Sequence, residues 1–339
     1  MTALPPPAPI REVAGVDRRR FDEEIRPAGQ PVVLRGLAAS WPAVEAGRHG
    51  PEAIVDYIMA CKPTRRVDAI VGPPEVEGRF FYRDDLRALN FTRGNAPLGD
   101  VLGRLLRDRA VERPYAMAVQ SEVIPELLPG FVETNRINLV DGDVQPRLWI
   151  GNAIRVAPHY DLKENVGVVI AGRRRFTVFP PEQLANLYPG PFELTPAGTP
   201  VSMVDLAAPD LNAFPRFAEA WKTAQAAELA PGDAIYLPFQ WWHGVDSLDP
   251  VSAFVNYWWT DDGAAFGNPY DAMLHALHTL KPLPPEQRAA WRRMFDYYVF
   301  ADHDPVEHLP AHARGLLGPQ TPALRAALTA TLKDVLKRL

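Results

Sequence analysis

The first third of the chain alternates between helical and extended apolar patterns. Its clearest helix covers 98–109, where five apolar residues share one face: Leu98, Val101, Leu102, Leu105 and Leu106. The patterns also predict helices at 18–25 and 51–59, with short strands at 31–34, 67–71 and 79–82. Residues 1–10 are expected to be extended or disordered.

The middle of the chain changes to short runs of β-branched and aromatic residues bounded by Gly, Pro or Asp. Strands are predicted at 115–119, 147–151, 166–170, 174–179, 234–237 and 252–259. Short strands punctuated in this way are typical of a sandwich or barrel. The stretch 181–225 interrupts them and contains a predicted helix at 214–226. It is too long for a simple turn, which indicates a lid or a binding surface.

From residue 263 onward the strand pattern stops. Helices are predicted at 269–280, 285–300, 306–317 and 321–339. In the last of these, apolar residues recur every four positions and form one stripe: Leu324, Leu328, Leu332 and Leu336. The stripe packs either on the chain's own barrel or on a second copy, and we favour a homodimer slightly. The predicted organisation is therefore a region 1–262, with a barrel at about 111–262, followed by a helical region 263–339.

Composition narrows the function classes. The chain has 339 residues, and 47% are hydrophobic, which is enough for a sizeable core. A net charge of −5 gives no overall basic surface for nucleic acid, although Arg18–Arg20 could form a local patch for RNA. Cys61 is alone, so no intramolecular disulfide can form, which fits a reducing compartment. We see no signal peptide and no run of about 18 apolar residues, so we expect a cytoplasmic protein without a membrane span.

Three residues could hold a metal ion. His159 and Asp161 lie two positions apart, so on a strand their side chains share a face. Alone, the pair reads equally well as a surface histidine and a turn aspartate. His243 follows a Pro-Gly-Asp turn and the strand 234–237, although a histidine after two tryptophans is more often packed than a ligand. Two histidines and one carboxylate form a facial triad that leaves positions open on Fe(II). A structural zinc site would usually use four ligands with cysteines.

The run Arg173–Arg175 is a candidate anion site. Such a run is ordinarily a solvated charge cluster. The two-residue period of a strand, however, places Arg174 on the same face as Phe176 and Val178. If that face is the core, the buried guanidinium needs an anionic partner. A carboxylate cosubstrate would provide one, because guanidinium binds carboxylate with two hydrogen bonds.

Several motifs together resemble the jumonji-C/cupin-8 family. They are Gly151-Asn152, Pro158-His-Tyr-Asp161, Asn165, Gly172-Arg-Arg-Arg-Phe-Thr-Val-Phe-Pro-Pro181, Pro231-Gly-Asp233, Trp241-Trp-His243 and Asn256-Tyr-Trp258. The group includes the asparaginyl hydroxylase that inhibits hypoxia-inducible factor, and its bacterial cupin-like members are the most similar. The resemblance covers about 115–260. It implies a mainly β fold with a double-stranded β-helix (jelly-roll) core, flanked by N-terminal helices and a C-terminal helical region.

The resemblance also implies a chemistry. Fe(II) is the expected cofactor, 2-oxoglutarate and dioxygen are the cosubstrates, and succinate and carbon dioxide are products. The implied metal ligands are His159, Asp161 and His243. The implied cosubstrate residues are Arg174, Tyr115, Asn165, Asn256 and Trp258. Two positions depart from the pattern, since Arg174 stands where the asparaginyl hydroxylase has lysine, and Val156 stands where threonine is expected.

We expect a hydroxylase that inserts oxygen into a C–H bond of a protein or peptide side chain, because the acidic net charge favours protein over RNA. A tRNA or small-molecule hydroxylase stays open. So does a metal-dependent cupin enzyme that does not use 2-oxoglutarate, although such sites usually contain more histidines. A non-catalytic cupin binding module is the third alternative, which the loss of a ligand would support.

Overall fold

The computed structural model describes residues 4–260, 269–319 and 321–337. The chain divides into two units, of which the first ends at Trp259 and the second begins at Thr260. The boundary predicted between residues 262 and 263 lies outside the described residues. So do the first three residues of the predicted extended N-terminus and the last two of the helix predicted at 321–339.

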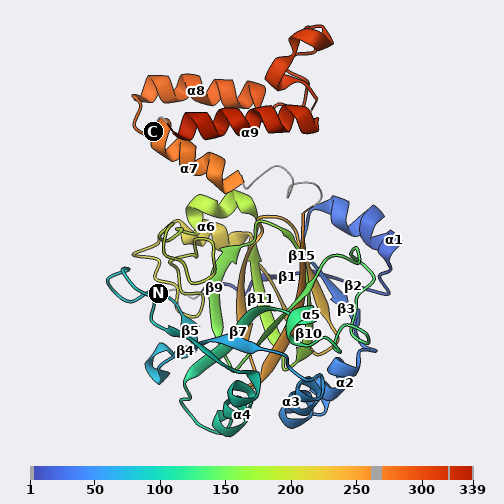
Figure 1. Cartoon of the computed structure of the whole chain (residues 1–339). Coiled ribbons are helices and arrows are strands. Elements are labelled where there is room, and N and C mark those ends of the chain that lie inside the picture. Colours follow the sequence, from blue (N-terminus) through green and yellow to red (C-terminus); the bar gives the residue numbers. More distant parts are fainter. Residues whose placement is uncertain (1–3, 261–268, 320, 338–339) are drawn as a thin grey trace. The chain divides into compact units, whose positions relative to one another are not determined.

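Two mixed β-sheets with a shared apolar core build the first unit (Figure 1). The smaller sheet has, in spatial order, β1 (Ala8–Pro9), β12 (Gln225–Leu229), β11 (Arg174–Phe179), β14 (Trp242–Ser247), β9 (Arg155–Tyr160) and β5 (Arg79–Phe80). The larger sheet has β2 (Arg11–Ala14), β3 (Val32–Arg35), β13 (Ala234–Leu237), β10 (Glu164–Ala171), β15 (Ser252–Trp259), β8 (Pro146–Gly151), β7 (Ala116–Val123), β4 (Arg66–Gly72) and β6 (Thr92–Pro97).

Alternation along the strands explains how the sheets pack together. Phe176 and Val178 of β11 point to one side and join Ile235 and Leu237 of β13 and Phe254 of β15 in one buried cluster. Strand pairing is antiparallel throughout the centre of both sheets. The expected mainly β fold with a jelly-roll core and added helices is confirmed.

Helices cover the outer face of the larger sheet. Val44, Ile54 and Leu102 project from three of them into a second core with Met117 and Val168 of the sheet. The helices of this unit are α1 (Arg18–Arg20), which continues into the π-helix η1 (Phe21–Ile25), α2 (Pro42–Arg48), α3 (Pro51–Ala60), α4 (Leu98–Asp108), α5 (Ile124–Leu127) and α6 (Phe217–Lys222). Short 3₁₀ helices are η2 (Arg26–Ala28), η3 (Pro74–Val76) and η4 (Pro181–Asn186).

Some predicted elements differ from the structure. The helix expected at 214–226 is only the six-residue α6, because residues from Gln225 onward pair with β11 as strand β12. Strands β9 and β14 and helix α2 were not among the predicted elements. Pro158 and Gly244 weaken the strand pattern of β9 and β14, which form because each pairs with the other.

The second unit contains α7 (Pro269–Thr279), α8 (Pro285–Tyr298) and α9 (Pro322–Leu336). The helix predicted at 306–317 is wrong. Turns and the short 3₁₀ helices η6 (Ala311–Ala313) and η7 (Gly315–Leu317) occupy that stretch. Pro310 removes a backbone donor, and Gly315 takes a left-handed φ of 50°. Among the described parts of the chain, no helix is long and apolar enough to cross a membrane.

Candidate metal and cosubstrate site

A cavity of about 380 Å³ lies between the two sheets of the first unit. His159, Val156 and His243 reach it from the smaller sheet, and Asn256 and Trp258 reach it from the larger one. The connection between β11 and β12, which we call the β11–β12 insertion (residues 180–224), adds Pro196, Ala197, Gly198 and Val201 to the wall. This long stretch therefore forms part of the cavity, as its length indicated.

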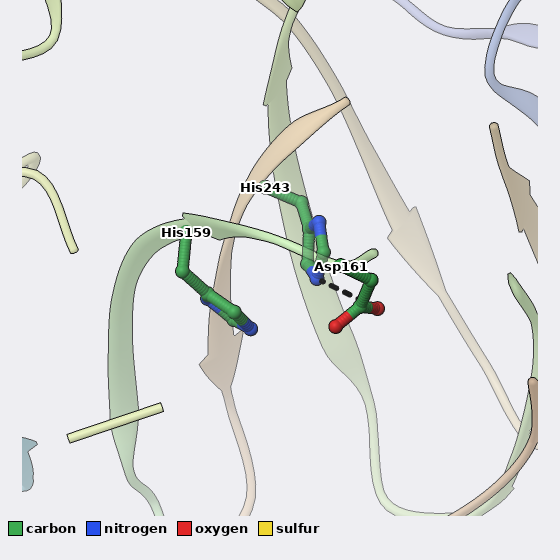
Figure 2. Close-up of side chains that lie close together, drawn as sticks. All are labelled: His159, Asp161 and His243. Carbon is green, nitrogen blue, oxygen red and sulfur yellow. Dashed lines mark ion pairs between the residues drawn. The ribbon is translucent and has the colours of Figure 1, made fainter. Parts of the chain in front are cut away.

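The three candidate metal ligands converge on one point of this cavity (Figure 2). His159 lies opposite His243 in the antiparallel pairing of β9 with β14, and Asp161 follows the last residue of β9. One ligand atom from each side chain lies within 4.8 Å of the other two. The shortest ion-pair distance joins His243 Nε2 to Asp161 Oδ2 at 3.8 Å. Residues about 80 positions apart are thus brought together by strand pairing.

Both histidines are held with the same nitrogen facing the cavity. His159 Nδ1 lies 3.0 Å from the carbonyl oxygen of Ala157, and His243 Nδ1 lies 3.0 Å from that of Trp241. A carbonyl can only accept, so each Nδ1 donates its proton and each Nε2 keeps a lone pair for a metal ion. Burial, and then the neighbouring His243, lower the pKa of His159 to about 4. The neutral imidazole is the form that binds metals.

A chain of hydrogen bonds orients the Asp161 carboxylate. Trp258 Nε1 and Asn165 Nδ2 both donate to Asp161 Oδ2 at 3.0 Å. Asn256 Nδ2 donates to Asn165 Oδ1 at 3.3 Å, and Trp149 Nε1 donates to Asn256 Oδ1 at 2.7 Å. Three of the five residues expected to bind the cosubstrate, Asn165, Asn256 and Trp258, therefore line the cavity, and in this structure their polar groups form the hydrogen-bond chain that ends on the Asp161 carboxylate. Trp149 was missed, because nothing in its local sequence sets it apart.

Arg174 lies in the same cavity and is only 7% exposed. Its Nε donates to Ser252 Oγ at 2.9 Å, and its guanidinium carbon lies 4.8 Å from the centroid of the Phe254 ring. Gly167 leaves room for that ring, since a methyl group there would overlap it. Within the described residues, no carboxylate forms an ion pair with Arg174, and burial lowers its pKa to about 9. The strand period placed Arg174 on this inner face, and the structure shows a buried cation without a counter-ion.

The expectations for Tyr115 and Val156 have different outcomes. Tyr115 is not brought to the cavity, because it precedes β7, is 45% exposed and packs against Arg104 of α4. Ala116 and Ala118 of β7 face inward, so the alternation of side chains directs Tyr115 away from the cavity. Val156 does line the cavity and contributes an apolar wall there.

Four further cavity residues were missed by the sequence patterns: Phe80, Arg93, Gln120 and Ser121. No motif marks them. The pairing of β4 with β6 and β7 brings Arg93, Gln120 and Ser121 to the mouth, whereas Phe80 of β5 lies beside Val156 through the parallel pairing of β5 with β9.

The β11–β12 insertion is bonded directly to the strand that carries His159. Ser202 N donates to the carbonyl oxygen of Pro158, and Thr199 Oγ1 donates to that of Tyr160, each at 2.7 Å. These bonds lie on either side of His159. The insertion therefore supports the metal-binding end of β9 as well as covering the cavity.

A jelly-roll of two sheets, with two histidines and an aspartate converging in its interior, is a cupin-type fold with a candidate metal site. The sequence comparison agrees. A family model described as a cupin-like domain (Cupin_8) matches residues 18–265, and the chain belongs to this family. The family includes Fe(II)- and 2-oxoglutarate-dependent oxygenases of the jumonji-C type.

Curated relatives are named as lysine-specific demethylases and as HSPB1-associated protein 1. The chain is 28% identical over 238 residues to lysine-specific demethylase 8 of Xenopus tropicalis, covering 68% of this chain and 48% of the relative. It is 32% identical over 156 residues to lysine-specific demethylase JMJ31 of Arabidopsis thaliana, covering 46% and 26%. It is 37% identical over 115 residues to human HSPB1-associated protein 1, covering 33% and 22%. The chain thus spans about half or less of the length of these relatives.

Proposed function

We propose that this protein is an Fe(II)- and 2-oxoglutarate-dependent oxygenase. The observation that carries the proposal is the unpaired Arg174 guanidinium in the cavity that also holds His159, Asp161 and His243. A buried cation without a partner is costly, and a bound carboxylate would compensate it. A dicarboxylic oxo-acid has one end for a metal ion and a second carboxylate for this arginine.

The donor set fits ferrous iron. His159 and His243 offer Nε2, Asp161 offers a carboxylate oxygen, and this combination leaves coordination positions open for other ligands. When bound, the iron would supply the activation of dioxygen for oxidation of a C–H bond. Arg174 would bind and orient the cosubstrate. Trp258 and Asn165 would hold Asp161 in its ligand orientation.

The apolar wall of the cavity also supports the proposed binding of a carboxylate by Arg174. Val156 and Val245 face each other across the paired strands β9 and β14, and both line the cavity. Phe176 of β11 continues the same cross-strand row. This wall offers no hydrogen bond to water or to a bound molecule, so it favours a dry site in which the Arg174–carboxylate attraction is strong.

We further propose that the oxidised substrate is a side chain of a protein or peptide, and that the product is an alcohol. Support comes from the relatives named as lysine-specific demethylases, since that name describes enzymes acting on an amino-acid side chain. A metal-dependent cupin that does not use 2-oxoglutarate would leave the Arg174 charge without a function.

The decisive test is anaerobic addition of Fe(II) and 2-oxoglutarate. We expect a weak visible charge-transfer band, and succinate formation when oxygen is admitted. His243→Ala should abolish the band. His49→Ala, which alters an exposed histidine outside the cavity, should leave it unchanged. Absence of both the band and succinate in the unaltered protein would refute the proposed function.

A further inference from the structure

The cavity mouth continues onto an exposed polar face of the larger sheet. In this sheet β7 pairs with β4, and β4 pairs with β6, which is the last strand of the described sheet on that side. Ile70 of β4 lies between Ala118 of β7 and Arg93 of β6, so side chains in this row share the inner face. We call the polar residues on and beside this row the mouth shelf: Arg66, Asp68, Arg93, Asn95, Gln120 and Ser121. Three of them, Arg93, Gln120 and Ser121, also line the cavity.

A β-bulge shapes the shelf where it meets the cavity. The pairing of β7 with β8 shifts register between Val119 and Glu122, and Ser121 takes a left-handed φ of 57°. A non-glycine residue held there costs of the order of 1–3 kcal/mol, and such strain clusters at functional sites. Arg147 Nη1 holds the bulge by donating to the carbonyl oxygen of Ser121 at 2.9 Å and to its Oγ at 3.2 Å. The bulge thus presents two polar side chains, Gln120 and Ser121, to the mouth.

Most charges around the shelf are already satisfied. Arg66 forms no ion pair with a described residue, but its Nε donates to Asn95 Oδ1 and its Nη2 to the Asn95 carbonyl oxygen, and Asn95 Nδ2 donates to Asp68 Oδ1. Arg65 pairs with the buried Glu122 at 2.7 Å. Arg93 differs. It is exposed, its guanidinium has neither an ion pair nor a hydrogen bond with any described residue, and its guanidinium carbon lies 5.6 Å from the Phe91 ring centroid. Among the described shelf residues, Arg93 is therefore the guanidinium left without a polar partner, and it lies directly at the mouth.

The backbone of β6 is also available. An edge strand presents unpaired N–H and C=O groups that an extended peptide can join as an additional strand. All but one of the six residues of β6 are exposed. A peptide placed along β6 would run past Arg93 and could direct one side chain into the cavity. A small molecule that fits wholly inside the cavity would use neither the edge nor the shelf.

We propose, resting on the oxygenase function above, that the mouth shelf binds an extended peptide segment alongside β6, with an acidic residue of that segment paired to Arg93. Edge-strand pairing gives affinity for any extended backbone, and Arg93 selects a carboxylate close to the oxidised side chain. A nucleic acid fits less well, because phosphate-driven binding needs several cations, whereas the shelf offers two arginines, Arg66 and Arg93, beside the acidic Asp68, and the chain carries a net charge of −5.

Fluorescence anisotropy with two labelled pools of twelve-residue peptides tests the proposal. One pool has Asp or Glu at fixed positions, and the other has Lys or Arg at the same positions. The protein is loaded with Fe(II) and 2-oxoglutarate under argon at low salt. We expect the acidic pool to bind about two- to fivefold more tightly, as for one partly exposed charge pair. Arg93→Glu should reverse this preference.

Two controls separate the components of the proposal. Arg107→Glu alters an exposed arginine of α4, the helix that packs against β4 and β6 from outside the cavity, and should leave the preference unchanged. Acidic peptides N-methylated at alternate positions should bind more weakly, since methylation removes the donors that pair with β6.

Three results would overturn the proposal. They are equal binding of both pools, an equal effect of the two arginine variants, or tighter binding of a single-stranded RNA pool that depends on Arg93. The charge-transfer band of the unaltered protein tests the oxygenase function separately. A refuted peptide-binding proposal can therefore be distinguished from a refuted oxygenase function.

Discussion

Replacing Arg174 by Met should stabilise the protein when no metal or cosubstrate is bound. Burial lowers the pKa of Arg174 to about 9, and at about 1.4 kcal/mol per pKa unit this corresponds to a burial cost of at most about 5 kcal/mol. Because the folded-state pKa is lowered, the cost is fully present at neutral pH and is relieved only above about pH 9. Met fills a similar volume without the charge.

Two lost contacts reduce the expected gain. The hydrogen bond to Ser252 is worth about 1 kcal/mol. The contact with the Phe254 ring is worth about 1–2 kcal/mol when desolvated. The free energy of unfolding of Arg174→Met should therefore exceed that of the unaltered protein by about 2 kcal/mol.

Guanidinium unfolding with and without 2-oxoglutarate, in the presence of anaerobic Fe(II), measures both halves of this prediction. A cosubstrate at 100 times its Kd should stabilise the unaltered protein by about 2.7 kcal/mol, and should stabilise Arg174→Met far less. The matched control is Arg173→Met. This exposed neighbour is paired with Asp249 and Glu228, and its loss should cost at most about 1 kcal/mol. A destabilised Arg174→Met protein would show that the guanidinium is already compensated, and would refute the reasoning.

Three further predictions concern the same structure. Trp258→Phe keeps an aromatic ring but removes the donor to Asp161, so Fe(II) affinity measured by anaerobic titration should fall at least about tenfold, and unchanged affinity would contradict the role given to Trp258. Gly167→Ala forces the Phe254 ring away from Arg174, so this variant should be less stable by about 1–3 kcal/mol and should have a higher Kd for 2-oxoglutarate. An unchanged stability and an unchanged Kd would show that the ring is free to move. The apolar helices of the second unit, whose Leu332 and Leu336 are each 58% exposed, stay a predicted homodimer surface. Light scattering should give about twice 37.6 kDa, and the monomer mass would exclude it.

Periodicity predicted well where burial on one face decides the structure. The stripe in 98–109 corresponds to α4, and its residues Leu98, Val101 and Leu102 are buried against the sheet. The two-residue period placed Arg174 beside Phe176 on the inner face. These patterns work because a side chain's direction follows from the local backbone.

Prediction failed where partners distant in sequence decide the structure. The first two residues of β12 (Gln225–Leu229) were predicted as the end of the helix 214–226, yet the whole strand pairs with β11. Tyr115 was assigned to the cosubstrate from motif position, and a one-residue difference in register puts it outside the cavity. Strand β14, which carries His243, was not predicted. Its local sequence does not favour a strand, and the segment is extended because it pairs with β9 and β11.

The sequence by itself therefore determined the residue types of the candidate metal site and the face on which Arg174 lies, because both are local properties. Only the tertiary structure decided which of them meet. It linked Trp149, Asn256 and Asn165 to Asp161, left Arg174 without a counter-ion, and brought Arg93 of an edge strand to the mouth of the cavity. The physical reason is that ion pairing, solvent exclusion and strand register depend on contacts between segments separated by tens to more than a hundred residues.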